Sequence, residues 1–127
     1  MTVQLAAVTF DCHDALALGT FWSQALGRPL DDGASTEFAA IGMAAHDGSE
    51  PPPRDIDRLT WMFASVPEGK QAKNRCHVDL TAPDREAEVQ RLTGLGATKI
   101  GEGSIWGFSW TVMQDPEGNE FCVAGQH

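Results

Sequence analysis

The sequence predicts an α+β protein in which two tandem βαβββ modules form one domain over residues 1–127. The length suits a single core, and the hydrophobic content of 42% and charged content of 21% are ordinary for a globular protein. Similar landmarks recur about 70 residues apart, and one stretch of the second half alternates apolar with polar residues. We place the first module at about residues 1–66 and the second at about residues 74–127.

In the first module, a helix is expected between Asp14 and Leu26. Asp14 can serve as its N-cap, Gly27 can take the left-handed conformation that follows a helix, and Pro29 prevents continuation. Three prolines at residues 51–53 cannot lie in a central strand. The expected strands lie at about residues 3–10, 37–44 and 59–65.

The second module repeats this plan. Asp84 can cap a helix that runs to Leu95, and Gly96 ends it. Residues 115–119, Asp-Pro-Glu-Gly-Asn, are typical of a hairpin turn, because proline presets φ and glycine accepts the left-handed conformation. The expected strands lie at about residues 75–81, 98–101, 108–114 and 119–124.

Three pairs of landmarks in the same order support the repeat. They are Val8 and Phe10 with Val78 and Leu80, Leu26-Gly27 with Leu95-Gly96, and Asp47-Gly48 with Glu117-Gly118.

The alternation assigns side chains to the two faces of the sheet. In residues 75–81, Val78 and Leu80 should pack under the helix, as should Val8 and Phe10 in the first module. In residues 119–124, Phe121 and Val123 should face the helix. The opposite face of the second module therefore collects four polar side chains: His77, Asp79, Glu120 and Cys122.

The charge and the cysteines exclude several classes of protein. A net charge of −9 and a pI near 4.6 argue against nucleic-acid or anionic-membrane partners, which need a basic surface. Lys70, Lys73 and Arg75 form a short basic group that either holds an anionic substrate or belongs to a solvated loop. Three widely spaced cysteines indicate neither a disulfide framework nor structural zinc. Without an apolar span or a signal-peptide pattern, we expect a cytoplasmic protein.

Three segments carry a family resemblance: VPEGKQAKNRCHVDL (66–80), DREAEVQRLTGLGA (84–97) and WTVMQDPEGNEFCV (110–123). They resemble the second half of glyoxalase-like domains of the vicinal-oxygen-chelate superfamily, which comprises glyoxalases, bleomycin-resistance proteins and extradiol dioxygenases. The resemblance implies a cupped mixed sheet with the helices outside and a small-molecule cavity inside. It also implies a homodimer.

In metal-dependent members of this superfamily, four ligands come from the first and last strands of the two modules. By resemblance these positions fall on Ala7, His77, Cys122 and residues 59–65, a stretch without His, Asp, Glu or Cys. The hydroxyl groups in that stretch are poor ligands for zinc or iron. We therefore expect no cofactor, and if a divalent metal does bind, we expect His77 and Cys122 to be its ligands.

The candidate catalytic residues are His77 and Asp79, as a general acid/base or hydrogen-bonding pair. A purely structural His–Asp pair is the alternative. The aromatic candidates for ligand stacking have core packing as their alternative, and Cys122 has the alternative of an inert buried thiol. The candidate substrate-binding residues are Trp61, Phe63, Trp110, Glu120 and Cys122.

Three functions remain open. The first is a metal-free protein that binds a small organic molecule in an aromatic-lined cup. The second is a lyase, isomerase or dioxygenase of the same superfamily that uses His77 with Asp79 or a bound divalent metal. The third is a structural or regulatory partner that uses its acidic surface and the proline-rich residues 50–55.

Overall fold

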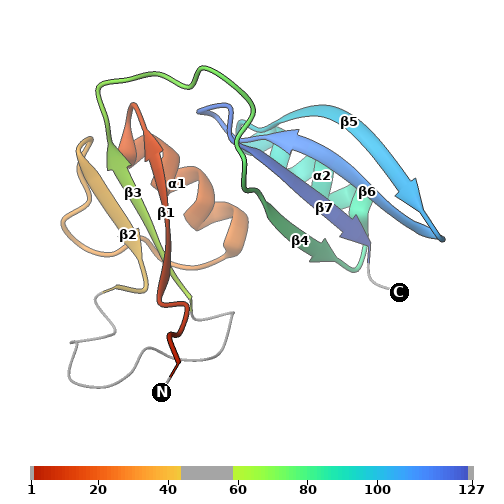
Figure 1. The fold of residues 1–127 in the computed structure, drawn as a ribbon, viewed down its shortest axis with the longest axis horizontal. Coiled ribbons are helices and arrows are strands. Elements are labelled where there is room, and N and C mark those ends of the chain that lie inside the picture. Colours follow the sequence, from red (N-terminus) through yellow and green to blue (C-terminus); the bar gives the residue numbers. More distant parts are fainter. Residues whose placement is uncertain (1, 44–58, 126–127) are drawn as a thin grey trace. The chain divides into compact units, whose positions relative to one another are not determined.

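The computed structural model describes residues 2–43 and 59–125 of the chain. The chain divides into two compact units, Met1–Gly69 and Lys70–His127, and Figure 1 shows the elements of each. Among the residues that the structure describes, each unit contains one helix and one mixed sheet, which confirms the predicted α+β class. The proline-rich residues 50–55 lie outside the described residues.

The first unit has a three-stranded sheet and one helix. Its elements are β1 (Ala7–Cys12), α1 (Ala15–Leu26), β2 (Phe38–Ile41) and β3 (Thr60–Ser65). The strand order is β1-β3-β2, with β1 parallel and β2 antiparallel to β3. The ladder between β1 and β3 begins at the pair Ala7 and Thr60, so β1 starts later than residue 3 and ends at Cys12.

The caps of α1 are those predicted. The Asp14 carboxylate accepts a hydrogen bond from the backbone N–H of Ala17 at 3.0 Å, and this satisfies a donor that the first turn leaves unpaired. Gly27 has a φ of 66°, and its N–H donates to the carbonyl of Ser23. Local sequence therefore determines both ends of this helix.

An aromatic cluster fills the core of the first unit. The ring of Trp22 on α1 lies 5.1 Å from that of Trp61 on β3, and Phe10 on β1 stacks on Trp61 at 5.7 Å and on Phe63 at 6.0 Å. Aromatic pairs at these separations add to the stability that burial supplies. This cluster joins β1 and β3 to α1.

The second unit has the complete βαβββ order. Its elements are β4 (Val78–Ala82), α2 (Arg85–Leu95), β5 (Thr98–Ile105), β6 (Phe108–Gln114) and β7 (Glu120–Gly125). The strand order is β4-β7-β6-β5, with β4 parallel to β7 and the other pairs antiparallel. Helix α2 lies against one face of this sheet (Figure 1). Asp84 caps the helix, as predicted, by accepting from the N–H of Ala87.

Two strands of this unit differ from the sequence prediction. β4 begins at Val78 rather than residue 75, because the segment before it is held by side chains of residues 119–120 instead of a strand ladder. β5 continues to Ile105, and a two-residue hairpin follows in which Trp106 and Gly107 both have positive φ values, 50° and 82°. Two positive φ values match the twist of a hairpin, but Trp-Gly lacks the Asn or Asp that usually signals this turn.

The turn at residues 115–119 is the predicted hairpin. The buried Asp115 carboxylate accepts from the backbone N–H groups of Glu117 at 2.9 Å and Asn119 at 3.0 Å, and Gly118 has a φ of 88°. In the described part of the chain, no helix has the length and apolar character needed to cross a membrane.

Candidate functional site

A pocket of about 440 Å³ lies on the sheet of the second unit. Strand register explains its lining. Asp79 on β4, Cys122 on β7 and Val112 on β6 are consecutive partners across the sheet, so their side chains share a face. The alternating residues Met113, Phe121 and Val123 are fully buried on the other face. The pocket is lined by Lys73, His77, Asp79, Trp110, Val112, Glu120 and Cys122.

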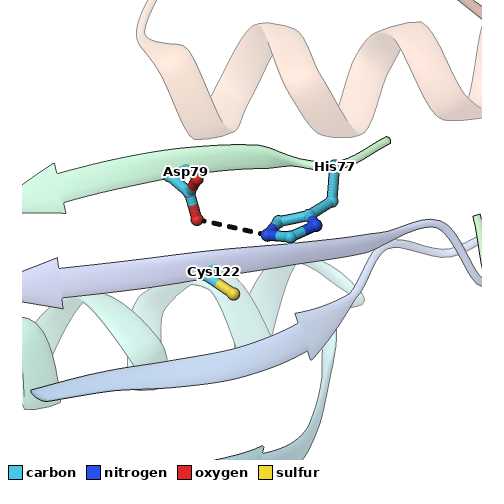
Figure 2. Close-up of side chains that lie close together, drawn as sticks. All are labelled: His77, Asp79 and Cys122. Atoms are coloured by element: carbon cyan, nitrogen blue, oxygen red, sulfur yellow. Dashed lines mark ion pairs between the residues drawn. The ribbon is translucent and has the colours of Figure 1, made fainter. Parts of the chain in front are cut away.

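His77, Asp79 and Cys122 form the polar part of this pocket. His77 lies directly before β4 and Asp79 lies on it, and the His77 Nε2 atom is 3.4 Å from Asp79 Oδ1. Figure 2 shows the imidazole and carboxylate turned toward each other, with the Cys122 thiol on the neighbouring strand. One donor atom from each of the three side chains lies within 4.8 Å of the others. The Asp79 side chain is 71% exposed, so the pair adds little to stability and is accessible to a ligand.

The Cys122 thiol is not set up as a nucleophile. Burial raises its pKa, the negative charge and hydrogen bond of Asp79 raise it further, and the positive charge of Lys73 opposes them only in part. Because its pKa is raised, this cysteine remains a thiol at neutral pH. The thiolate is the reactive form of cysteine, so the side chain is a poor nucleophile. These surroundings favour a lining role for Cys122 over covalent chemistry.

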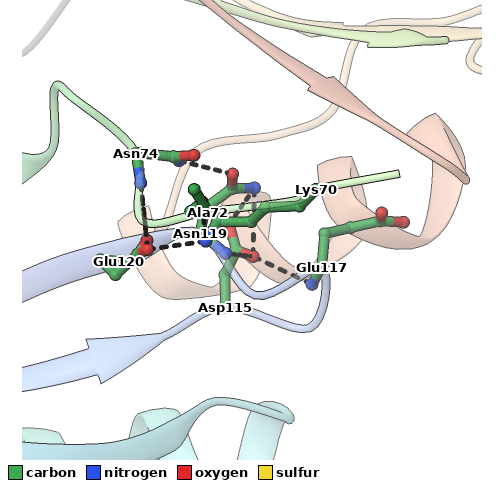
Figure 3. Close-up of polar contacts among 7 residues, drawn as sticks. All are labelled: Lys70, Ala72, Asn74, Asp115, Glu117, Asn119 and Glu120. Carbon is green, nitrogen blue, oxygen red and sulfur yellow. Dashed lines mark hydrogen bonds and ion pairs between the residues drawn. The ribbon is translucent and has the colours of Figure 1, made fainter. Parts of the chain in front are cut away.

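Glu120 connects the pocket to the segment that precedes β4 (Figure 3). Its side chain is only 5% exposed, and it accepts from Lys70 Nζ at 2.7 Å and from the backbone N–H of Asn74 at 3.2 Å. The side chain of Asn74 also donates to Asn119 at 2.8 Å. Burial raises the pKa of Glu120, but the hydrogen bonds from Lys70 and Asn74 outweigh it and hold the pKa below its ordinary value. Glu120 is therefore a charged anchor for residues 70–74.

Trp110 lies over Gly103 of the adjacent strand. The two residues are partners in the β5–β6 ladder, and a Cβ atom placed on Gly103 would meet Cε2 of the indole at 2.5 Å and Nε1 at 2.8 Å. Sequence reasoning selected Trp110 but missed Gly103. A glycine inside a strand is a known signal of close approach by another group, so this position was detectable.

The structure places Trp61 and Phe63 in the core of the first unit. Trp61 is the register partner of Val8 on β1, and Phe63 that of Phe10, so all four side chains point toward α1. Their ring contacts with Phe10 and Trp22 agree with this orientation. The structure thus places both side chains among the buried residues that face the helix, and neither lines the pocket of the second unit. Their assignment to ligand binding stays a prediction.

The residues at the four metal-ligand positions implied by the resemblance do not fit a metal. Ala7 has no donor atom, and β3 offers only hydroxyl groups. Those hydroxyls have other partners: Thr60 donates to the Gly42 carbonyl and Ser65 to the His13 carbonyl. At these positions the first unit therefore supplies no ligand of the expected kind, although β1 carries Asp11 and Cys12 nearer its end. The second unit holds a different set, His77, Asp79 and Cys122.

Comparison with solved structures identifies the same fold in other proteins. The structures below all share less than a fifth of their residues with this chain, so they bear on the fold alone. A glyoxalase/bleomycin resistance protein/dioxygenase family enzyme from Burkholderia phytofirmans aligns with a TM-score of 0.71 at 17% identity, over 97% of this chain and 98% of its own. The fosfomycin resistance protein FosX from Listeria monocytogenes aligns with a TM-score of 0.71 at 12% identity, over 100% and 96%. Lactoylglutathione lyase from Agrobacterium tumefaciens gives 0.64 at 12%, over 98% and 95%.

No curated protein matches the chain. The family model described as "Glyoxalase-like domain" matches residues 7–124, which is nearly the whole sequence. The matched range runs from the start of β1 to the penultimate residue of β7 and so includes both modules. The chain therefore belongs to the glyoxalase-like domain family.

Proposed function

We propose that this protein binds a small organic molecule in the pocket of its second unit, without the metal used by other members of the superfamily. The observation that carries the proposal is the composition of the pocket. Apolar surface from Trp110 and Val112 meets a few polar groups from His77, Asp79 and Lys73 in a volume of about 440 Å³. Pockets for small molecules have this volume and this mixture, in which apolar walls supply affinity and polar groups fix orientation.

We propose a metal-free pocket because of the residues that occupy the expected metal-ligand positions. The positions on β1 and β3 where ligands are expected carry no His, Asp, Glu or Cys within the described residues. A site at the four positions implied by the resemblance would therefore lack half of its ligands. Zinc and iron require nitrogen, sulfur or carboxylate donors, which backbone-bonded hydroxyls do not replace.

A second function is favoured by the three donors around Asp79. The superfamily includes proteins named as lyases and resistance proteins, and a lyase, isomerase or dioxygenase would use His77 with Asp79, or a divalent ion held by His77, Asp79 and Cys122. His77 is in reach of a bound molecule because it lines the pocket. In this alternative the imidazole accepts a proton from the substrate or returns one to it.

Ligand binding is tested with a library of small organic compounds. We expect hits that change tryptophan fluorescence and raise the melting temperature, because a ligand in the pocket lies against Trp110. Trp110→Leu should weaken binding at least tenfold. Trp106→Leu, which removes an exposed tryptophan that does not line this pocket, should leave affinity unchanged.

His77→Ala separates the two functions in the same assay. Binding that persists in this variant while turnover of a hit compound disappears would place the enzyme alternative first. If no compound binds, or if binding is indifferent to Trp110→Leu, the proposed function is wrong.

Metal content is the second test. We expect elemental mass spectrometry of untagged protein to find no zinc, iron, nickel or manganese at one ion per chain, and a chelator to leave the melting temperature unchanged. The physical reason is the missing half of the ligand set at the positions implied by the resemblance.

One ion per chain with a lower melting temperature after chelation would contradict the metal-free proposal. Cys122→Ser and Asp79→Asn would then locate the ion, since both should remove it if the set in the second unit is the ligand set. The exposed Cys76 supplies the control, because Cys76→Ser should have no effect.

A further inference from the structure

The geometry of Trp110 indicates what kind of molecule the pocket accepts. Because the position of a Cβ on Gly103 falls 2.5 Å from Cε2 and 2.8 Å from Nε1 of the indole, the ring lies directly above the Gly103 backbone. A side chain's Cβ projects out of the sheet plane, so the indole edge formed by Cζ2, Cε2 and Nε1 occupies the space above Gly103 on β5. The indole is therefore held against this strand while it also lines the pocket.

Glycine at position 103 is explained by this ring and not by backbone conformation. Six glycines of the described chain have a positive φ, and Gly103 is not among them. Any residue would suit the backbone there, but a side chain would occupy the space of the indole. Gly103 thus acts as a positioning residue that leaves space for the Trp110 indole.

The pocket also contains the positive charge of Lys73. Lys73 lines the pocket, and no described carboxylate forms an ion pair with it. Its neighbour in sequence, Lys70, is already bound to Glu120, whereas the Asp79 carboxylate lies 3.4 Å from the imidazole of His77. Among the described pocket residues, Lys73 therefore supplies an ammonium group that is available to bind a ligand.

We propose that the pocket is selective for small planar aromatic anions such as aromatic carboxylates, with the ring stacked on Trp110 and the anionic group at Lys73. This inference rests on the proposed binding function and specifies its ligand class. Offset stacking favours a flat aromatic ring over a saturated one. A charge-assisted hydrogen bond to an ammonium favours a carboxylate over a neutral amide. In a chain with a net charge of −9, an unpaired cation in a pocket is a specific attraction for an anion.

The experiment measures three probes by isothermal titration calorimetry: naphthalene-2-carboxylate, its neutral amide, and the saturated decahydronaphthalene-2-carboxylate. The aromatic acid should bind at least tenfold more tightly than either of the others. Lys73→Gln should lower the affinity for the aromatic acid at least tenfold and leave that for the amide unchanged. Lys99→Gln is the matched control, because it removes the same charge from the same unit but outside the pocket.

Gly103→Ala tests whether the space above Gly103 positions the Trp110 indole for stacking. The variant should lower the affinity for the aromatic acid at least tenfold and change the affinity for the saturated acid little, because the methyl group displaces the indole. Gly101→Ala on the same strand is its control, since a Cβ at Gly101 would meet no atom. The melting temperature of each variant shows whether it folds.

The outcomes separate this inference from the proposed function. Equal affinities for the acid and the amide, or unchanged affinity in Lys73→Gln, would overturn the anion selectivity. Equal affinities for the aromatic and saturated acids would overturn the stacking. In either case, binding of other library compounds sensitive to Trp110→Leu would still support the proposed function, whereas no binding of any compound would overturn both.

Discussion

Replacing Leu18 by alanine should lower the free energy of unfolding by about 2–5 kcal/mol, the range measured for buried Leu→Ala substitutions. Leu18 lies on α1 and has no exposed surface. Its loss removes buried apolar area and leaves a cavity beside the sheet that the surrounding side chains fill only in part. The measurement is chemical denaturation followed by circular dichroism, with comparison of midpoints and slopes.

Leu16→Ala is the matched control on the same helix. The substitution is chemically identical and changes helix propensity by the same amount, but Leu16 is 39% exposed. We expect a cost of about 1 kcal/mol or less, as for partly exposed positions. Equal costs for the two variants would mean that α1 does not bury the face described here, and the core assignment of Trp61 would fail with it.

Replacing Lys70 by methionine should cost about 1–3 kcal/mol near neutral pH, because it leaves a buried carboxylate without its cation. Glu120 retains only the backbone N–H of Asn74 among its partners from the preceding segment. The Lys70 side chain is itself 25% exposed, so solvent screens part of the interaction and the lower half of that range is expected. Lys99→Met is the control, since its partner Glu102 is largely exposed and the expected cost is about 0.5 kcal/mol or less.

The pH dependence of this cost has a defined sign. The pKa of Glu120 is lowered in the folded protein, so its ionised form contributes stability above the ordinary pKa of 4.5 and loses that contribution as the pH falls through the folded value. Without Lys70, the carboxylate keeps its burial and its backbone hydrogen bonds but loses the hydrogen bond and the charge of the lysine. The difference in stability between the wild type and Lys70→Met should therefore be largest near pH 7 and narrow below pH 4.5. A difference independent of pH would show that the lysine acts through packing and not through its charge.

Short-range sequence signals were sufficient for much of the fold. Both helix starts follow from an aspartate whose side chain caps the first turn, and the turn at residues 115–119 follows from its proline and glycine. These features depend on residues only a few positions apart, whose preferences are expressed without tertiary contacts. The alternation in β4 and β7 likewise placed His77, Asp79, Glu120 and Cys122 beside one pocket, because side-chain direction in a strand has a strict period of two.

The remaining features depend on which strands pair and in which register. Trp61 and Phe63 face α1 because β3 pairs in parallel with β1, a contact between segments about fifty residues apart that no local pattern reports. The start of β4 depends on contacts of Asn74 with residues 119–120. The packing of Trp110 against Gly103 depends on the register between β5 and β6.

The sequence by itself thus determined the family, the helices and the polar face of the second sheet, since each is encoded by neighbouring residues or by a motif. Only the tertiary structure decided which aromatic side chains form the core and which one lines the pocket. It also decided that Lys70 binds Glu120 and that Lys73 lines the pocket. Each of these choices is made by long-range packing, where one register shift would exchange the two faces of a strand.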